Sequence, residues 1–322
     1  MWPFCGRCNS KARLDGITAV VTGCNTGIGK CTALDFVRRG GRVIMACRDL
    51  QKAKEAADDI RMETQNLSGA GDVVVVRLDL SSLSSVRECA NEILNKESRI
   101  QLLVNNAGVM ACPKGQTQDG FETQFGVNHL GHFLLTCLLL PRILSSAPAR
   151  IVNVSSHAHY FGSIDFEDLN LERSYTPTSA YFRSKLANIL FTKELSSRLQ
   201  GTQVTTYAVH PGVVATDLGR HLDTTMFKGV SWMFRNVGKL FMKTPEEGAQ
   251  TSIYCAVDEN VKNDSGLYYS NCRKCMPSPK ARDRSLARKL WEVSARLVGL
   301  GDWDPFSASD TKKCICLLSS SL

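Results

Sequence analysis

The sequence has no uninterrupted run of about 18 apolar residues, the shortest length expected of a helix that crosses a membrane. Its opening residues, MWPFCGRCNSKARL, also lack the apolar core of a secretory signal peptide. We therefore expect a cytoplasmic chain in a reducing compartment. The 13 cysteines are then mostly buried small apolar side chains and do not form a disulfide framework.

Short basic runs with interleaved aromatic residues are missing too, so the formal net charge of +8 does not indicate nucleic-acid binding. It suits an anionic cofactor or a membrane surface. No Gly/Ser-rich linker, internal repeat or low-complexity segment divides the chain. With 43% hydrophobic and 22% charged residues, we expect one domain over residues 1–322, with a core at about 15–300 and flexible termini.

Short apolar segments rich in β-branched residues alternate with segments of helical periodicity. The predicted strands are 17–22, 41–47, 73–79, 100–105, 150–155, 203–209 and 266–270. The predicted helices are 27–40, 51–64, 82–97, 120–145, 178–201 and about 281–298. This alternation predicts a Rossmann-type, doubly wound α/β fold, with a mainly parallel seven-stranded sheet and helices on both faces.

A glycine cluster, TGCNTGIGK, follows the first predicted strand and opens the first predicted helix. Glycines at 23, 27 and 29 allow a tight turn and a close approach of the backbone to a phosphate. The helix that follows directs its free N–H groups at the same place. Glycines also make ordinary turns, but this position between a strand and a helix favours dinucleotide binding by Gly23, Asn25, Thr26, Gly27, Ile28 and Gly29.

The choice between NAD and NADP is read at the end of the second strand, where an acidic side chain would accept the ribose hydroxyls of NAD. The strand ends ACRD, so Cys47 takes the acidic position and Arg48 follows it. A guanidinium can bind a 2′-phosphate with two hydrogen bonds. Lys30 adds a further positive charge nearby. Asp49 keeps an NAD interpretation open, but the pattern favours NADP.

Taken together, the motifs resemble those of the short-chain dehydrogenase/reductase family, in family order. They are TGCNTGIG, LDL (78–80), NNAG (105–108), GVNHLGHF (126–133), IVNVSS (151–156), YFRSK (181–185) and HPGVVATDL (210–218). The longer stretches DGFETQFGVNHLGHF and YFRSKLANILFTKEL are similar to the NADP-linked retinol dehydrogenase branch. The resemblance implies an NADP(H)-dependent oxidoreductase that interconverts retinol and retinal.

The resemblance also implies further cofactor-binding residues. Asp79, beside Leu80, matches the residue that hydrogen-bonds adenine, although a lone aspartate there could instead cap the next helix. Asn106, Ala107 and Gly108 match the turn beside the adenosine ribose. Residues near the nicotinamide are matched by Pro211, Gly212, Val214 and Thr216.

Four residues carry the implied proton transfer. Ser156 ends the fifth strand and Tyr181 begins the helix that returns beside it, so both reach the carboxyl edge of the sheet. Tyr181 is the expected acid and base, and Ser156 polarises the carbonyl oxygen. Lys185, one turn after Tyr181, and the cationic nicotinamide are expected to lower the pKa of the phenol. Asn128 would orient a water bound to the lysine.

The remaining histidines and cysteines do not predict a metal site. His129 and His132 would supply only half a zinc site, and the pairs Cys5/Cys8 and Cys272/Cys275 are far apart in the chain. His157 and His159 fit either the substrate pocket or a surface loop. Cysteines near both termini are candidates for palmitoylation, which would hold the enzyme on a membrane such as the endoplasmic reticulum.

Apolar residues at 221–243 predict either a lid over a long lipophilic aldehyde or alcohol, or a packed helix pair. Retinal fits such a pocket, and so do farnesal, a long-chain aldehyde or a steroid. A non-catalytic NADP(H)-binding scaffold is the alternative from another class. The apolar helices at 120–140 and 178–200 either pair across the two-fold axis of a homodimer or cover the sheet of one chain.

Overall fold

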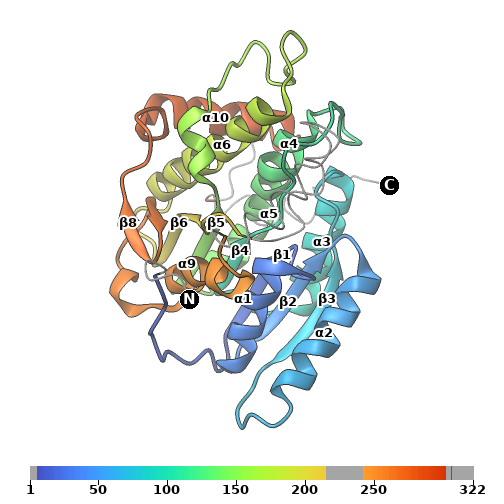
Figure 1. Ribbon diagram of the computed structural model, residues 1–322, viewed down its shortest axis with the longest axis vertical. Helices are drawn as coiled ribbons and strands as arrows, with labels where there is room; N and C mark the ends of the chain where they lie inside the picture. The colour runs from blue at the N-terminus through green and yellow to red at the C-terminus, as the bar shows by residue number, and fades with distance from the viewer. Residues whose placement is uncertain (1–5, 215–241, 302–305, 307–322) are drawn as a thin grey trace.

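In the computed structural model, residues 6–214, 242–301 and 306 are described, and one sheet runs through the middle of the molecule (Figure 1). Its strand order is β3-β2-β1-β4-β5-β6-β7-β8. The first seven strands run parallel to one another: β1 (Thr18–Thr22), β2 (Arg42–Cys47), β3 (Asp72–Arg77), β4 (Leu102–Asn105), β5 (Ala149–Val154), β6 (Val204–His210) and β7 (Leu267–Ser270). Each overlaps a predicted strand, so the predicted parallel sheet is confirmed.

An eighth strand, β8 (Arg273–Cys275), pairs antiparallel with β7 and was not predicted. Its sequence, RKC, is short and polar, and the two positively charged residues are exposed. An edge strand that buries little apolar surface lacks the apolar pattern from which strands are predicted.

Helices cover both faces of the sheet, as predicted for a doubly wound fold. One apolar core lies between the sheet and α1 (Gly27–Arg38), α2 (Leu50–Thr64) and α9 (Pro245–Val257). The other lies between the sheet and α3 (Leu83–Lys96), α5 (Gly131–Ser145), α6 (Pro177–Arg198) and α10 (Arg284–Leu297). Short 3₁₀ turns follow at His157–Phe161, Glu259–Val261 and Lys280–Arg282. Helix α9 was not predicted.

Helix α10 lies beside α6 in Figure 1 and covers the apolar helices of its face. Trp291 of α10 meets Phe133 of α5 edge-on, with ring centroids 4.9 Å apart, and stacks on Phe191 of α6 at 5.8 Å. Helix α5 buries every residue from Gly131 to Leu140. The structure shows these helices covering the sheet of their own chain, and their pairing across a two-fold axis stays a prediction.

The helical stretch Thr123–Ser145 is long and apolar enough to cross a membrane by length and composition, a candidate that the search for uninterrupted apolar runs had missed. However, 78% of its most apolar window is buried inside the protein. Buried core helices of α/β sheets have the same composition, so the stretch is weak support for a membrane span.

This stretch is not a uniform helix. It starts as α4 (Thr123–Phe125), widens into one π-helical turn at Gly126–Leu130 and continues as α5. The carboxylate of Glu122 caps its start by accepting hydrogen bonds from the backbone N–H groups of Gln124 and Phe125, at 2.8 and 2.9 Å. The π turn, which often marks functional sites, contains Asn128.

Several predictions concern residues outside the described ranges. They are the flexible termini with Cys5, Cys314 and Cys316, the cofactor contact of Thr216, and most of the lid at 221–243.

Candidate active site

A groove of about 660 Å³ lies along the carboxyl ends of the parallel strands. It is lined by Gly23, Asn25, Thr26, Gly27, Ile28, Gly29, Arg48, Asp79, Leu80, Asn106, Ala107, Gly108, Ser156, Tyr181, Lys185, Pro211, Gly212 and Val214. These are all of the predicted site residues except Asn128, which is buried behind the groove, and Thr216. The structure therefore brings together residues that are far apart in the sequence.

The glycine loop between β1 and α1 forms one wall of this groove. Gly23 has a φ of +61°, and a Cβ there would lie 2.7 Å from the Cβ of Ala107. A Cβ on Gly29 would lie 2.5 Å from both the Gly23 oxygen and Asn106 Nδ2. Helix α1 begins at Gly27, so its unpaired N–H groups face the groove. The loop therefore fits the diphosphate of a dinucleotide.

Asn106 holds this loop in place. Its Nδ2 donates hydrogen bonds to the backbone oxygens of Thr22, at 2.9 Å, and Gly23, at 3.1 Å. The Asn106 side chain thus braces the loop that would hold the diphosphate, and the predicted cofactor contact of this residue stays a prediction.

A buried chain of hydrogen bonds runs from the glycine loop to the π turn. Thr22 Oγ1 accepts from the backbone N–H groups of Asn106 and Ala107, at 2.9 and 3.0 Å, so its own hydrogen is available to His132 Nε2 at 2.8 Å. His132 therefore carries its proton on Nδ1 and donates it to the Asn128 backbone oxygen at 3.1 Å. Burial lowers the pKa of His132 to about 4, which keeps the ring neutral.

The end of the groove beside the carboxyl ends of β2 and β3 carries charged side chains of both signs. Arg48, Asp49 and Lys52 all line it. The Asp49 carboxylate accepts a hydrogen bond from the Lys52 backbone N–H at 3.1 Å and so caps α2. Lys52 was missed from the sequence, although the first turn of a helix after a strand is where such a residue reaches this edge. Lys30, which was expected to add charge here, instead pairs with Asp59 at 2.6 Å.

Asp79 does not cap the next helix. Ser82 is the N-cap of α3, and Asp79 Oδ1 accepts from Ser81 N at 2.9 Å and Ser81 Oγ at 2.7 Å. Asp79 lines the groove, as Leu80 does. The alternative role considered for it from the sequence is therefore excluded.

Ser156 and Tyr181 meet at the other end of the groove. Ser156 follows β5 and its Oγ accepts a hydrogen bond from the Ala158 N–H at 3.2 Å. Burial raises the pKa of Tyr181 to about 12, and a hydrogen bond with Ser156 acts in the opposite direction. The lowered pKa expected from the sequence also requires a cationic nicotinamide, and it stays a prediction.

Lys185 lies one helical turn after Tyr181, with Nζ 5.6 Å from the centre of the tyrosine ring. Nζ donates a hydrogen bond to the Val154 oxygen at 3.2 Å. Burial lowers the pKa of Lys185 to about 8. Lys185 thus lines the groove with its ammonium close to the Tyr181 ring.

The side chain of Asn128 joins two walls of the site. Its Oδ1 accepts from the Val109 N–H at 2.8 Å, and its Nδ2 donates to the Val109 oxygen and to Ser184 Oγ, both at 2.9 Å. Ser184 Oγ in turn donates a hydrogen bond to the backbone carbonyl oxygen of Tyr181 at 2.8 Å. Asn128 therefore positions the loop after β4 and the helix that carries Tyr181. Its predicted role in a water relay is not tested by these contacts.

His129, His157 and His159 each have a polar or ring contact within the fold. His129 Nε2 lies 2.9 Å from Ser294 Oγ. His159 Nδ1 lies 2.7 Å from the Ser156 oxygen, and His157 stacks on His210 at 4.8 Å. Neither His157 nor His159 lines the groove. Within the described ranges, no group of three or more His, Cys, Asp or Glu side chains has an arrangement suited to a metal ion.

Comparisons with known proteins agree with this geometry. Residues 17–226 match the family model of the short chain dehydrogenases. The chain is 54% identical over 299 residues to retinol dehydrogenase 13 of Homo sapiens, covering 92% of this chain and 88% of that protein. It is 50% identical over 295 residues to retinol dehydrogenase 12 of Homo sapiens, covering 92% and 90%. A crystal structure of an uncharacterised protein from Mycobacterium paratuberculosis is 36% identical, with a TM-score of 0.73 and coverage of 91% and 97%.

The chain belongs to the short-chain dehydrogenase family. It is therefore an oxidoreductase that uses a nicotinamide dinucleotide and acts on the alcohol or carbonyl group of a small substrate. Within the family it lies in the branch of the retinol dehydrogenases, with about half of its residues identical to theirs.

Proposed function

We propose that this chain is an NADP(H)-dependent oxidoreductase that interconverts retinol and retinal. One observation carries the proposal: the groove has Ser156 and Tyr181 at one end and the positively charged Arg48 and Lys52 at the other. The names of the similar proteins support the substrate, because retinol dehydrogenases 12 and 13 match over most of their length.

The preference for NADP rests mainly on Arg48, because Lys52 Nζ lies 4.0 Å from Asp49 Oδ2 and forms an ion pair with it. Asp49 is the acidic group nearest to the position that selects NAD, but its carboxylate is engaged in capping α2. Arg48 and Lys52 line the same part of the groove. A 2′-phosphate there would gain charge-assisted hydrogen bonds from Arg48, and from Lys52 if its ammonium turns from Asp49 to the phosphate, whereas a 2′-hydroxyl would gain much less.

The nicotinamide, when bound, exchanges a hydride with the substrate carbon, and the side chains handle the proton. The substrate oxygen accepts hydrogen bonds from Ser156 Oγ and from the Tyr181 hydroxyl, which orients the carbonyl and stabilises charge on the oxygen. Tyr181 donates its proton during reduction and accepts one during oxidation. Lys185 would hold the ribose of a bound cofactor and would favour the phenolate, while Asn128 holds the tyrosine helix in place.

The titration of Tyr181 favours reduction at neutral pH. Its pKa of about 12 leaves the phenol protonated and ready to donate. Oxidation needs the phenolate, so it requires a higher pH or the added positive charge of an oxidised nicotinamide.

We further propose that the expected peripheral membrane contact uses the surface close to Ser156. Tyr160, Phe161 and Met276 are 44%, 76% and 69% exposed, and the Tyr160 hydroxyl donates to the Met276 oxygen at 2.6 Å. Arg273 and Lys274 are exposed beside them in the chain. Apolar and cationic side chains in one place suit an anionic lipid surface. Retention on vesicles of anionic lipid, lost in Phe161→Ser, tests this.

The proposed function is tested by turnover of all-trans-retinal with NADPH or NADH, beside a Tyr181→Phe control and a panel containing farnesal, a long-chain aldehyde and a steroid ketone. NADPH-selective reduction of retinal that collapses in the control is expected. An inert retinal beside another rapidly reduced carbonyl would move the substrate to that class. A chain that retains the nucleotide and turns over nothing would instead be a binding scaffold.

A further inference from the structure

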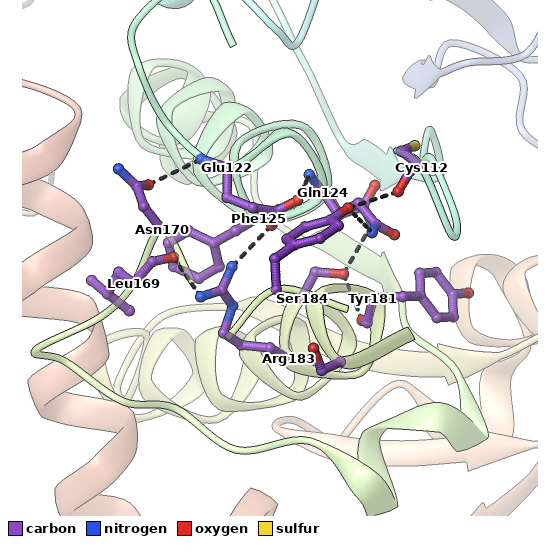
Figure 2. Close-up of polar contacts among 12 residues, drawn as sticks. Cys112, Glu122, Gln124, Phe125, Leu169, Asn170, Tyr181, Arg183 and Ser184 are labelled. Carbon is purple, nitrogen blue, oxygen red and sulfur yellow. Dashed lines mark hydrogen bonds and ion pairs between the residues drawn. The ribbon is translucent and has the colours of Figure 1, made fainter. Parts of the chain in front are cut away.

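The first turns of α6, which carry Tyr181, are attached to the α4–π segment by buried polar contacts on residues that do not line the groove (Figure 2). Gln124 Nε2 donates to the Pro177 oxygen at 2.8 Å. Arg183 Nη2 donates to Glu122 Oε2 at 2.9 Å. We call Glu122, Gln124 and Arg183 the clamp. Pro177 is the first residue of α6, so the clamp holds the helix on both sides of Tyr181.

Gln124 extends the clamp to the loop after β4. Its Oε1 accepts from the Ala111 N–H at 2.9 Å, and Ala111 has a φ of +50°, which is uncommon for a residue with a Cβ. The Tyr175 hydroxyl donates to the Cys112 oxygen at 2.7 Å and lies 3.4 Å from Gln124 Nε2. One amide therefore ties a strained loop position to the start of α6. This loop also carries Val109, which lines the groove.

The ion pair of the clamp joins a third segment to the same place. Arg183 Nη1 donates to the Leu169 oxygen, and the Glu122 N–H donates to Asn170 Oδ1 at 3.0 Å. Glu122 and Arg183 are 1% and 2% exposed, and the guanidinium lies over the Phe125 ring at 5.0 Å. Figure 2 shows these side chains converging between the helices, with Tyr181 pointing away from them. Charges buried this deeply hold only one geometry well.

We propose that Gln124, locked between the ion pair and the Ala111 loop, is a positioning residue for the reaction: it sets the distance between the Tyr181 hydroxyl and the substrate oxygen. The inference rests on the proposed role of Tyr181 as proton donor. Gln124 contacts neither substrate nor cofactor, since it lies outside the groove. It acts through two hydrogen bonds, one to each of the walls between which the carbonyl must fit. Small displacements of a reacting group lower rates steeply.

The sharpest test is Gln124→Glu, because a protonated glutamic acid has the shape and hydrogen-bonding capacity of glutamine. The protonated acid can donate to the Pro177 oxygen while accepting from the Ala111 N–H. The ionised carboxylate has no hydrogen to donate and faces the Pro177 oxygen directly. The groups around it are Glu122 and Arg183 of the clamp, the Tyr175 hydroxyl and the Cys112 thiol. Burial and the Glu122 carboxylate raise the pKa of the new acid, and the Arg183 guanidinium acts in the opposite direction.

For Gln124→Glu we expect kcat for aldehyde reduction close to that of the native protein at low pH, falling about tenfold as the pH rises through the pKa of the new acid. KM for NADPH should stay unchanged. Gln118→Glu adds the same charge at an exposed position in the loop before α4 and should leave the native pH profile. Gln124→Met, similar in size but unable to make either bond, should be slow at every pH.

Hydrogen exchange gives a readout that does not depend on turnover. In Gln124→Met, the amide of Ala111 and the first turns of α6 should exchange faster, while α2 exchanges as in the native protein. The inference would be overturned if the pH profile of kcat for Gln124→Glu parallels the native profile and the Ala111 amide of Gln124→Met exchanges at the native rate. If the native protein itself reduces no carbonyl compound while Tyr181→Phe binds NADPH normally, the proposed function falls, and the positioning role falls with it.

Discussion

The buried ion pair between Glu122 and Arg183 allows a quantitative prediction about stability. Arg183→Met removes one partner and leaves a carboxylate that is 1% exposed. Two backbone N–H groups still bind it, at 2.8 and 2.9 Å, so we expect a loss near the lower end of the range for broken buried pairs, ~3 kcal/mol. Glu122→Gln leaves the guanidinium with backbone oxygens and Phe125 as neighbours, and should cost ~3–5 kcal/mol.

The double variant Glu122→Gln/Arg183→Met should lose less than the sum, because neither charge is left unpaired. We expect a coupling of ~2–3 kcal/mol. Denaturant unfolding in the absence of NADPH, followed by circular dichroism, gives the free energy of unfolding of the native protein, the two single variants and the double variant. Arg288→Met breaks an exposed pair with Glu292 and should change the free energy of unfolding by less than about 0.5 kcal/mol. Additive losses in the double variant would refute the argument, because two charges that stabilise each other cannot be removed independently.

Two further predictions concern the groove. Arg48→Gln should raise KM for NADPH by about tenfold to a hundredfold and leave KM for NADH nearly unchanged, because only the 2′-phosphate loses a charge-assisted bond. Lys30→Gln is the control, since Lys30 pairs with Asp59. Equal effects of Arg48→Gln on both cofactors would contradict the assignment. The rate of retinol oxidation with NADP⁺ should rise between about pH 6 and about pH 9, because the phenolate of Tyr181 accepts the proton. In steady-state assays, Tyr181→Phe should be slower by about 10²–10⁴-fold at every pH. A native oxidation rate that falls as the pH rises would exclude this residue as the base.

The parallel strands could be predicted from the sequence because strands buried on both faces are continuous apolar runs. Strand β8 could not be, since it is polar and only its pairing with β7 makes it a strand. Helix α9 did have a local signal that was overlooked. Thr244 and Glu247 form a capping box around Pro245, and this combination marks a helix start.

Within the site, motifs identified the groove residues, but not what each side chain does. Asn106 lines the groove, but the motif did not show that its side chain braces the glycine loop. Asp79 could have capped a helix, and only the structure shows Ser82 in that role. Burial raises the pKa of Tyr181 against a hydrogen bond with Ser156, and burial is a property of the folded chain. Gln124 had no signal at all, because its partners come from residues 111 and 177, which no spacing rule connects.

The hydrogen-bond chain from Thr22 through His132 to Asn128 has a consequence for where the protein can work. The imidazole is an acceptor on Nε2, so it cannot take up a second proton without breaking the bond from Thr22. Its pKa of about 4 lies below that of a free histidine, so unfolded chains bind this proton first as the pH falls. The stability contributed by the neutral ring is complete above about pH 6.5 and is lost progressively towards pH 4, by ~3 kcal/mol in all. A contact that joins the cofactor loop to the π turn thereby makes the fold less stable in acid, so the neutral ring contributes fully only in compartments above about pH 6.5.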